Sequence, residues 1–273
     1  MPKTNNEITD LITIMKRLRD PEAGCPWDIQ QDFATIAPHT IEEAYEVAEA
    51  IDKNDMPHLK DELGDLLFQV VFHAQMASEK DYFDFSDVVK SSCEKMTRRH
   101  PHIFGNSDYR SAEEQTEAWE NQKAEERQQK DHQTSIIDGV TSGLPAFSRA
   151  VKLQNRAARV GFDWPDTSQV LNKLNEEMTE LSHELIQNNK GHDNKGEIFE
   201  EFGDMMFVYA NLARHLNIDP EAALRSANHK FERRFKAVEH SAKEQNKSLK
   251  SMTLDEMGQL WDEVKLREKA AKV

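Results

Sequence analysis

The sequence has 273 residues, which is enough for one large domain or two of ordinary size. Apolar residues make up 37% and charged residues 31%, while glycine (10) and proline (9) are scarce, so amphipathic helices around modest cores are favoured over turn-rich sheets. The formal net charge of −15 disfavours nucleic acid and anionic membrane as partners, and a phosphate-bearing ligand would need local cations or a metal.

The two cysteines and the N-terminal segment indicate the compartment. Cys25 and Cys93 lie far apart and in no CxxC spacing, so both are expected to be reduced thiols. The first twenty residues lack an apolar signal core, and nothing approaches eighteen consecutive apolar residues. We therefore expect a cytoplasmic protein without a membrane span.

Helical periodicity dominates the first part of the chain. Residues 8–18 carry apolar side chains at helical spacing, a second helix is expected to begin near Thr40, and a third is expected over about 57–78. A fourth is expected over about 84–99. The side chains predicted to be buried on the third helix share one stripe: Leu59, Leu63, Leu66, Leu67, Val70 and Ala74.

The middle of the chain is predicted to contain a fifth helix and a linker. Ser111 and Glu114 have the spacing of a capping box, which predicts a helix after Ser111. Residues 121–145 then become strongly polar and end in glycine, serine and proline. We interpret them as a charged helix tail followed by a linker.

Helices resume after the linker in a similar order. One is expected to begin near Pro145, one over about 168–187, and one over about 197–216. Asp219 followed by Pro220 predicts the N-terminus of another helix.

The second half also repeats residue motifs of the first half. Five features return in the same order, 134 to 142 residues later: Glu42-Glu43-x-x-Glu46 as Glu176-Glu177-x-x-Glu180, Glu62-Leu63-Gly64-Asp65 as Glu201-Phe202-Gly203-Asp204, Lys95-x-x-Arg98-Arg99 as Lys230-x-x-Arg233-Arg234, Trp27 as Trp164, and Trp119 as Trp261. This order indicates duplication. We predict an all-α protein of two tandem helical-bundle modules, 1–120 and 146–273, joined by the polar linker 121–145.

The repeated acidic residues predict a metal site. Glu177 and Glu180 are three apart on one helix, as Glu201 and Asp204 are on the next, and a short loop makes the two helices antiparallel neighbours. Four carboxylates would then converge, and oxygen ligands suit Mg²⁺ or Mn²⁺. Since Mg²⁺ is usually shared with substrate phosphates, a phosphate ester or anhydride is the expected substrate.

The same site is expected in the first module, from Glu43, Glu46, Glu62 and Asp65. The plain alternative is that these are solvated helix faces, and Thr40-x-x-Glu43 also has the spacing of a capping box. Either motif alone would favour that alternative. The recurrence of both motifs favours the metal site.

A basic cluster follows each acidic set. Lys230, Arg233 and Arg234 lie within about one helical turn and offer a grip for a triphosphate, with Trp261 as a surface on which a base could stack. The first module offers the same set: Lys95, Arg98, Arg99 and Trp119. A solvated helix face and a tryptophan in a core are the alternatives.

At this point the chain resembles the MazG family of all-α nucleoside triphosphate pyrophosphohydrolases over nearly its whole length. No P-loop, dinucleotide-binding, zinc or GxSxG pattern competes with this resemblance. The motifs that carry it are GCPWD (24–28), TIEEAYE (40–46), DELGDLLFQV (61–70), RRHPHIF (98–104), RVGFDW (159–164), EEMTE (176–180), EEFGDMMF (200–207) and KFERRF (230–235).

The resemblance implies a homodimer, with sites formed between packed helices. It also implies Mg²⁺ held by Glu177, Glu180, Glu201 and Asp204, and substrate contacts from 173–177, 230–234 and Trp261. The matching positions of the first module are Glu43, Glu46, Glu62, Asp65, Lys95, Arg98, Arg99 and Trp119.

The halves differ at one position that matters for phosphate binding. Lys173 has His39 as its counterpart, and a neutral imidazole binds phosphate poorly. We therefore expect the C-terminal module to be the main active site.

The expected reaction is hydrolysis of ATP and other nucleoside triphosphates, ribo and deoxy, to monophosphate and pyrophosphate. A water held by the carboxylates or the metal would attack the α-phosphorus, and the cations of the basic cluster would hold the leaving pyrophosphate. Either Glu176 or Glu177 could orient that water. Nucleotide pool control and removal of damaged nucleotides are both compatible roles.

Three alternative interpretations of the sequence remain. A di-iron carboxylate bundle needs paired Glu-x-x-His motifs, and Glu180-x-x-His183 is the only candidate. A non-catalytic helical scaffold would leave the carboxylates solvated. A dimeric all-α dUTP pyrophosphatase is a closer relative that the duplicated form and the broad arginine cluster disfavour.

Overall fold

The chain folds entirely from helices wherever its structure is described. The computed structural model describes residues 7–105, 111, 114–115, 118–119, 122 and 135–270. These residues contain no strand, which confirms the predicted all-α class. They separate into two compact units, Met1–Glu126 and Arg127–Val273. None of the helices in the described ranges is both long and apolar enough to cross a bilayer.

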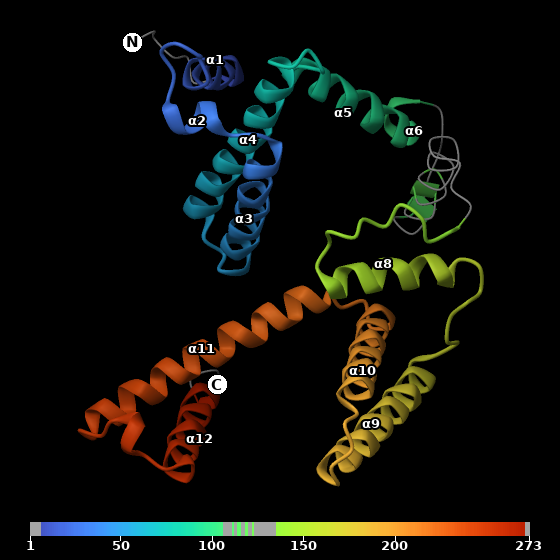
Figure 1. Cartoon of the computed structure of the whole chain (residues 1–273), viewed down its shortest axis with the longest axis vertical. Helices are drawn as coiled ribbons and strands as arrows, with labels where there is room; N and C mark the ends of the chain where they lie inside the picture. Colours follow the sequence, from blue (N-terminus) through green and yellow to red (C-terminus); the bar gives the residue numbers. More distant parts are fainter. Residues whose placement is uncertain are drawn as a thin grey trace. The chain divides into compact units, whose positions relative to one another are not determined.

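The N-terminal unit is built around an antiparallel helical hairpin (Figure 1). Its helices are α1 (Ile8–Leu18), α2 (Pro26–Gln30), α3 (Phe33–Asp52), α4 (Met56–Ser78), α5 (Phe85–Arg99) and α6 (Pro101–Phe104). Helices α3 and α4 pack along their length, α1 lies against α4, and α5 continues from its end. The short helices α2 and α6 were not predicted from the sequence.

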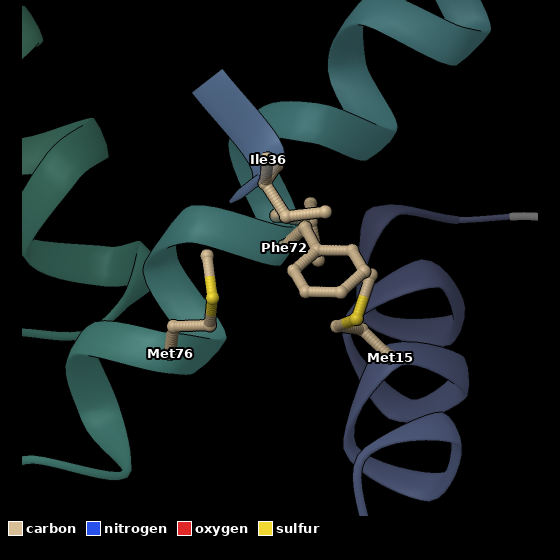
Figure 2. Close-up of a cluster of buried hydrophobic side chains, with 5 residues drawn as sticks. Met15, Ile36, Phe72 and Met76 are labelled. Carbon is tan, nitrogen blue, oxygen red and sulfur yellow. The ribbon is translucent and has the colours of Figure 1, made fainter. Parts of the chain in front are cut away.

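The core of this unit lies where α1, α3 and α4 meet. Figure 2 shows Phe72 of α4 beside Met15, Ile36 and Met76, and all four side chains are almost completely buried. Arg19 reinforces this junction, because its guanidinium pairs with Glu79 at 2.7 Å. The same side chain also donates to the backbone carbonyls of Asp28, within α2, and Gln31, just after it.

The predicted start of the second helix is wrong by seven residues. Helix α3 begins at Phe33, after Asp32, whose carboxylate accepts hydrogen bonds from the next turn and forms a capping box with Thr35. Thr40 lies inside the helix, so the predicted box with Glu43 does not exist. Pro38 lies within the helix and removes one backbone donor, which hides the continuity of the helix from a reading of the sequence.

The predicted buried stripe of α4 is also largely wrong. Of its six members only Ala74 is buried, whereas Leu63, Leu67 and Val70 are 50%, 41% and 37% exposed. The buried positions of α4 are Glu62, Gln69, Val71, Phe72, Ala74, Met76 and Ala77. The buried positions of α4 are set by the two helices that pack on it, α3 and α1. The face of α4 that contacts them differs from its most apolar face.

The C-terminal unit repeats the hairpin and adds a second helical pair (Figure 1). Its helices are α8 (Ala146–Ala158), α9 (Thr167–Asn189), α10 (Lys195–His215), α11 (Pro220–Glu244) and α12 (Leu254–Ala270), with a 3₁₀ turn at Leu249–Ser251. Helices α8 to α11 match the predicted helices within a few residues. Helices α9 and α10 pack together, α8 lies on α10, and α11 pairs with α12 around a small core of Val238, Ala242, Leu260 and Val264.

The predicted fifth helix and linker fall partly outside the described residues. The Ser111 hydroxyl accepts a hydrogen bond from the Glu114 N–H at 3.2 Å, which is one half of the predicted capping box. Of the segment 121–145, residues 121 and 123–134 lie outside the description. At its end, Arg156 of α8 donates to the carbonyls of Ile136 and Asp138, so this part of the segment is attached to the C-terminal unit.

Candidate metal centres and basic clusters

Each unit brings three acidic side chains together between its paired helices. In the C-terminal unit, carboxylate oxygens of Glu177 and Glu180 from α9 and of Glu201 from α10 all lie within 4.8 Å of one another. The i,i+3 spacing sets both α9 side chains on one face, and the antiparallel packing of α10 brings Glu201 opposite them. Glu177 is the most enclosed of the three, at 4% exposed.

The N-terminal unit has the matching set on α3 and α4. Oxygens of Glu43, Glu46 and Glu62 also lie within 4.8 Å of one another. Here the most enclosed member is Glu62 of α4, at 8% exposed. In each set one carboxylate is buried, which differs from a fully solvated helix face.

The fourth predicted ligand of each set lies apart. Asp65 and Asp204 are exposed and are not among the mutually close oxygens. Their charges still act on the sets: burial together with Asp65 raises the pKa of Glu43. Burial, and then the charges of neighbours that include Asp204, raises the pKa of Glu201.

Burial and the neighbouring carboxylates raise pKa values in both acidic sets. Burial and the charge of Glu46 also raise the pKa of Glu62. Ionised carboxylates at this separation repel one another, and a divalent ion would remove that repulsion. The donors are oxygens only, which fits a hard cation such as Mg²⁺ or Mn²⁺.

The ammonium group of Lys173 contacts Glu177, the first glutamate of the C-terminal set. Lys173 Nζ lies 2.7 Å from Glu176 Oε1 and 2.7 Å from Glu177 Oε1. Its hydrogen bonds to the two carboxylates raise the pKa of Lys173. In this structure Lys173 is therefore paired with Glu176 and Glu177.

The C-terminal basic cluster is already paired with an acidic residue that sequence reasoning missed. Arg233 Nε and Arg234 Nε lie 2.9 and 2.8 Å from the two oxygens of Glu268 on α12. Hydrogen bonds from Arg233 and Arg234 lower the pKa of Glu268 to about 2. Glu268 follows Trp261 by seven residues, so helical spacing alone could have placed both on the face that meets α11.

Trp261 packs against the same stretch of α11. Its ring centroid lies 5.5 Å from that of Phe231 and 5.9 Å from the guanidinium carbon of Arg234, and the side chain is half-buried. Lys230 is exposed. A cavity of about 580 Å³ borders Arg234. Its lining consists of charged side chains of both signs and one leucine: Arg234, Asp262, Lys265, Leu266, Glu268 and Lys269.

The N-terminal basic residues occupy the end of α5. Lys95 and Arg98 are exposed and Arg99 is half-buried. Trp119 lies 5.1 Å, centroid to centroid, from His100, which ends α5. In both units, then, the repeated tryptophan lies beside the helix that carries the basic cluster.

The acidic and basic groups of the C-terminal unit belong to different helical pairs. The carboxylates lie on α9 and α10, whereas α11 packs mainly against α12 and α8. His183, the histidine required by the di-iron alternative, is exposed and lies outside the acidic set of the described chain. The geometry therefore gives no support to a Glu-x-x-His iron site.

Comparison with known proteins agrees with the internal duplication. The MazG nucleotide pyrophosphohydrolase domain matches the chain twice, over residues 31–104 and 166–239. The nucleoside triphosphate pyrophosphohydrolase of Escherichia coli K12 is 48% identical, over 96% of this chain and 98% of its own. The nucleoside triphosphate pyrophosphohydrolase/pyrophosphatase MazG of Thermotoga maritima is 41% identical, over 94% of each chain.

Proposed function

We propose, from the premise that the chain belongs to the MazG family of nucleotide pyrophosphohydrolases, that its C-terminal unit is the main catalytic site. The enzyme converts nucleoside triphosphates to monophosphate and pyrophosphate, and we assign it Mg²⁺ dependence and activity on ribo- and deoxynucleotides. The observation that carries this assignment is the set of three carboxylates within 4.8 Å beside Lys173. The N-terminal unit has the acidic set but His39 in place of that lysine.

The residues of the C-terminal set fit a magnesium ion. Glu177, Glu180 and Glu201 would hold it, with Asp204 one turn from Glu201 as a further acidic neighbour. When bound, the ion would neutralise phosphate charge and polarise a phosphoryl oxygen. Mn²⁺ would fit the same oxygen donors.

The protein's own groups would then guide the attack of water. Glu176 or Glu177 orients the water and accepts its proton as the water oxygen bonds to the α-phosphorus. The bond from that phosphorus to the bridging oxygen breaks, and pyrophosphate leaves. Lys230, Arg233 and Arg234 hold the developing charge, which requires Arg233 and Arg234 to exchange Glu268 for phosphate.

The products provide the direct test. Incubation of ATP and of dATP with the protein and Mg²⁺ in ¹⁸O-labelled water should release pyrophosphate, with the label in the monophosphate. Attack at the α-phosphorus places the new oxygen there. Mass spectrometry of both products checks this, with a metal-chelated sample as control. Orthophosphate with nucleoside diphosphate, or label in pyrophosphate, would exclude the proposed reaction.

We also propose that the protein forms a homodimer. Corresponding side chains of α4 and α10 present apolar surface to solvent: Leu63 and Phe202 are both 50% exposed, and Val70 and Tyr209 are 37% and 42% exposed. Such repeated exposure supports burial against a second copy of the chain. A partner could also supply the basic groups that lie on another helical pair.

A charge placed on this face should disrupt the dimer. The native chain is expected at about twice its 31.5 kDa mass in size-exclusion chromatography with light scattering. Phe202→Asp should shift the mass toward the monomer, because a buried unpaired carboxylate is costly. Phe162→Asp, at a loop residue that is 79% exposed, is the matched control and should stay dimeric. A native monomer would refute the proposal.

A nucleotide-handling role inside the cell follows from the reaction. Control of the ordinary nucleotide pool and removal of damaged nucleotides both consume triphosphates and release pyrophosphate. We propose one of these two roles for the protein, in the cytoplasm.

A further inference from the structure

The two acidic sets differ in the group that contacts the first glutamate of the repeated motif. Glu177 is contacted by the Lys173 ammonium, 2.7 Å away. Its counterpart Glu43 accepts a hydrogen bond from the amide of Gln69, with Nε2 3.4 Å from Oε1. His39, which replaces the lysine, instead lies 3.4 Å from Glu42. One set therefore contains a built-in positive charge, and the other contains a neutral amide.

Gln69 is unusual for its position. It is only 8% exposed, and its Oε1 has no hydrogen-bond partner among the described residues. The corresponding residue of the other unit is Val208, which is 4% exposed and fills the same place with an apolar side chain. A buried amide oxygen without a partner is costly, so the side chain that contacts Glu43 through its Nε2 points to a ligand or a bound water at its Oε1.

The difference in charge affects how strongly each set would bind a divalent ion. In the C-terminal set, Lys173 takes up an oxygen of Glu177, one of the three carboxylates that an ion would use, and its positive charge repels the ion. In the N-terminal set the described contacts to Glu43 and Glu62 come from the amide of Gln69 and from the imidazole of His58, whose Nδ1 lies 3.2 Å from Glu62.

We propose that the N-terminal set is the cation site of the nucleotide-free protein, and that Lys173 keeps divalent ions out of the C-terminal set until a triphosphate draws its ammonium away. The first half of this inference stands on the N-terminal geometry alone. The second half rests on the proposed function, because it takes the C-terminal set to bind triphosphate.

Manganese titration of the full-length protein without added nucleotide tests the order of binding. Electron paramagnetic resonance of unbound Mn²⁺ should show one strong site per chain. Glu46→Gln should remove it, and Glu62→Gln should do the same as a second variant. Glu180→Gln should leave it in place. Loss of the strong site in Glu180→Gln, or two equal sites in the native chain, would overturn the proposal.

Lys173→Gln tests the role of the ammonium. Removal of one charge within a few ångströms should tighten Mn²⁺ binding at the C-terminal set about tenfold or more, so that a second strong site appears. Lys247→Gln breaks an ion pair with Glu256, 3.0 Å long, elsewhere in the same unit and should change nothing. Unchanged binding in Lys173→Gln would refute the gating role of Lys173.

These measurements are independent of turnover. A native protein that shows the expected order of Mn²⁺ binding but releases no pyrophosphate would refute the proposed reaction and leave the cation assignment standing. A protein that releases pyrophosphate but loads its C-terminal set first would do the reverse.

Discussion

Glu201→Gln should lower the rate of pyrophosphate release roughly a thousandfold, while the far-ultraviolet circular dichroism spectrum stays that of the native protein. Glu201 is the carboxylate that α10 contributes opposite Glu177 and Glu180, so its neutralisation removes one side of the proposed metal site. Glutamine keeps the shape of the side chain. The loss should therefore appear in kcat and in Mg²⁺ dependence rather than in folding.

The control for this prediction lies on the same helix. Glu197 is exposed in the first turn of α10 and belongs to neither acidic set, so Glu197→Gln should retain native turnover. If Glu201→Gln were as active as Glu197→Gln, the C-terminal set could not be the catalytic centre. Asp204→Asn provides a graded comparison, because Asp204 lies outside the close oxygens and should matter less than Glu201 if only direct contact counts.

Phe72→Ala should destabilise the N-terminal unit by about 3–5 kcal/mol. Phe72 is 1% exposed and lies at the meeting point of α1, α3 and α4 in Figure 2. Its truncation leaves a cavity that these neighbours cannot fill without moving the hairpin that carries Glu43, Glu46 and Glu62. Urea unfolding followed by circular dichroism should show an early transition for this unit, separate from that of the C-terminal unit.

A substitution at an exposed phenylalanine of the same unit shows whether the loss of stability comes from the burial of the ring or from its removal alone. Phe104 belongs to the same unit and is 63% exposed, so Phe104→Ala should change the free energy of unfolding by less than about 0.5 kcal/mol. A single transition shifted for the whole chain in Phe72→Ala would show that the two units unfold together. Equal effects of the two substitutions would contradict the assigned core.

The Arg233–Arg234–Glu268 contact shows why a basic motif alone does not describe a phosphate site. The sequence identifies the cations and shows that the cluster is repeated in both halves. The structure adds that both guanidinium groups are held by one carboxylate from α12. In the proposed reaction a triphosphate would replace that carboxylate, so Glu268 would compete with the substrate for both guanidinium groups.

Several features followed from the sequence without any tertiary information. The helical class, the duplication and the pairing of acidic residues at i,i+3 spacing all depend on local periodicity, which determines the direction of each side chain about its own helix axis. The repeated order of motifs strengthened each weak local pattern. The family was identified separately, through the resemblance of the sequence motifs to the MazG family, before any geometry was known.

Only the tertiary structure decided which of those side chains meet. Helical periodicity does not specify the face of α4 that contacts α3 and α1, so the predicted apolar stripe pointed largely to solvent and Gln69 was buried beside Glu43. It could not separate Glu201, which joins its set, from Asp204, which stays outside it. By contrast, the contact between Lys173 and Glu177 is an i,i+4 pair within α9, so helical spacing along the chain is enough to account for it.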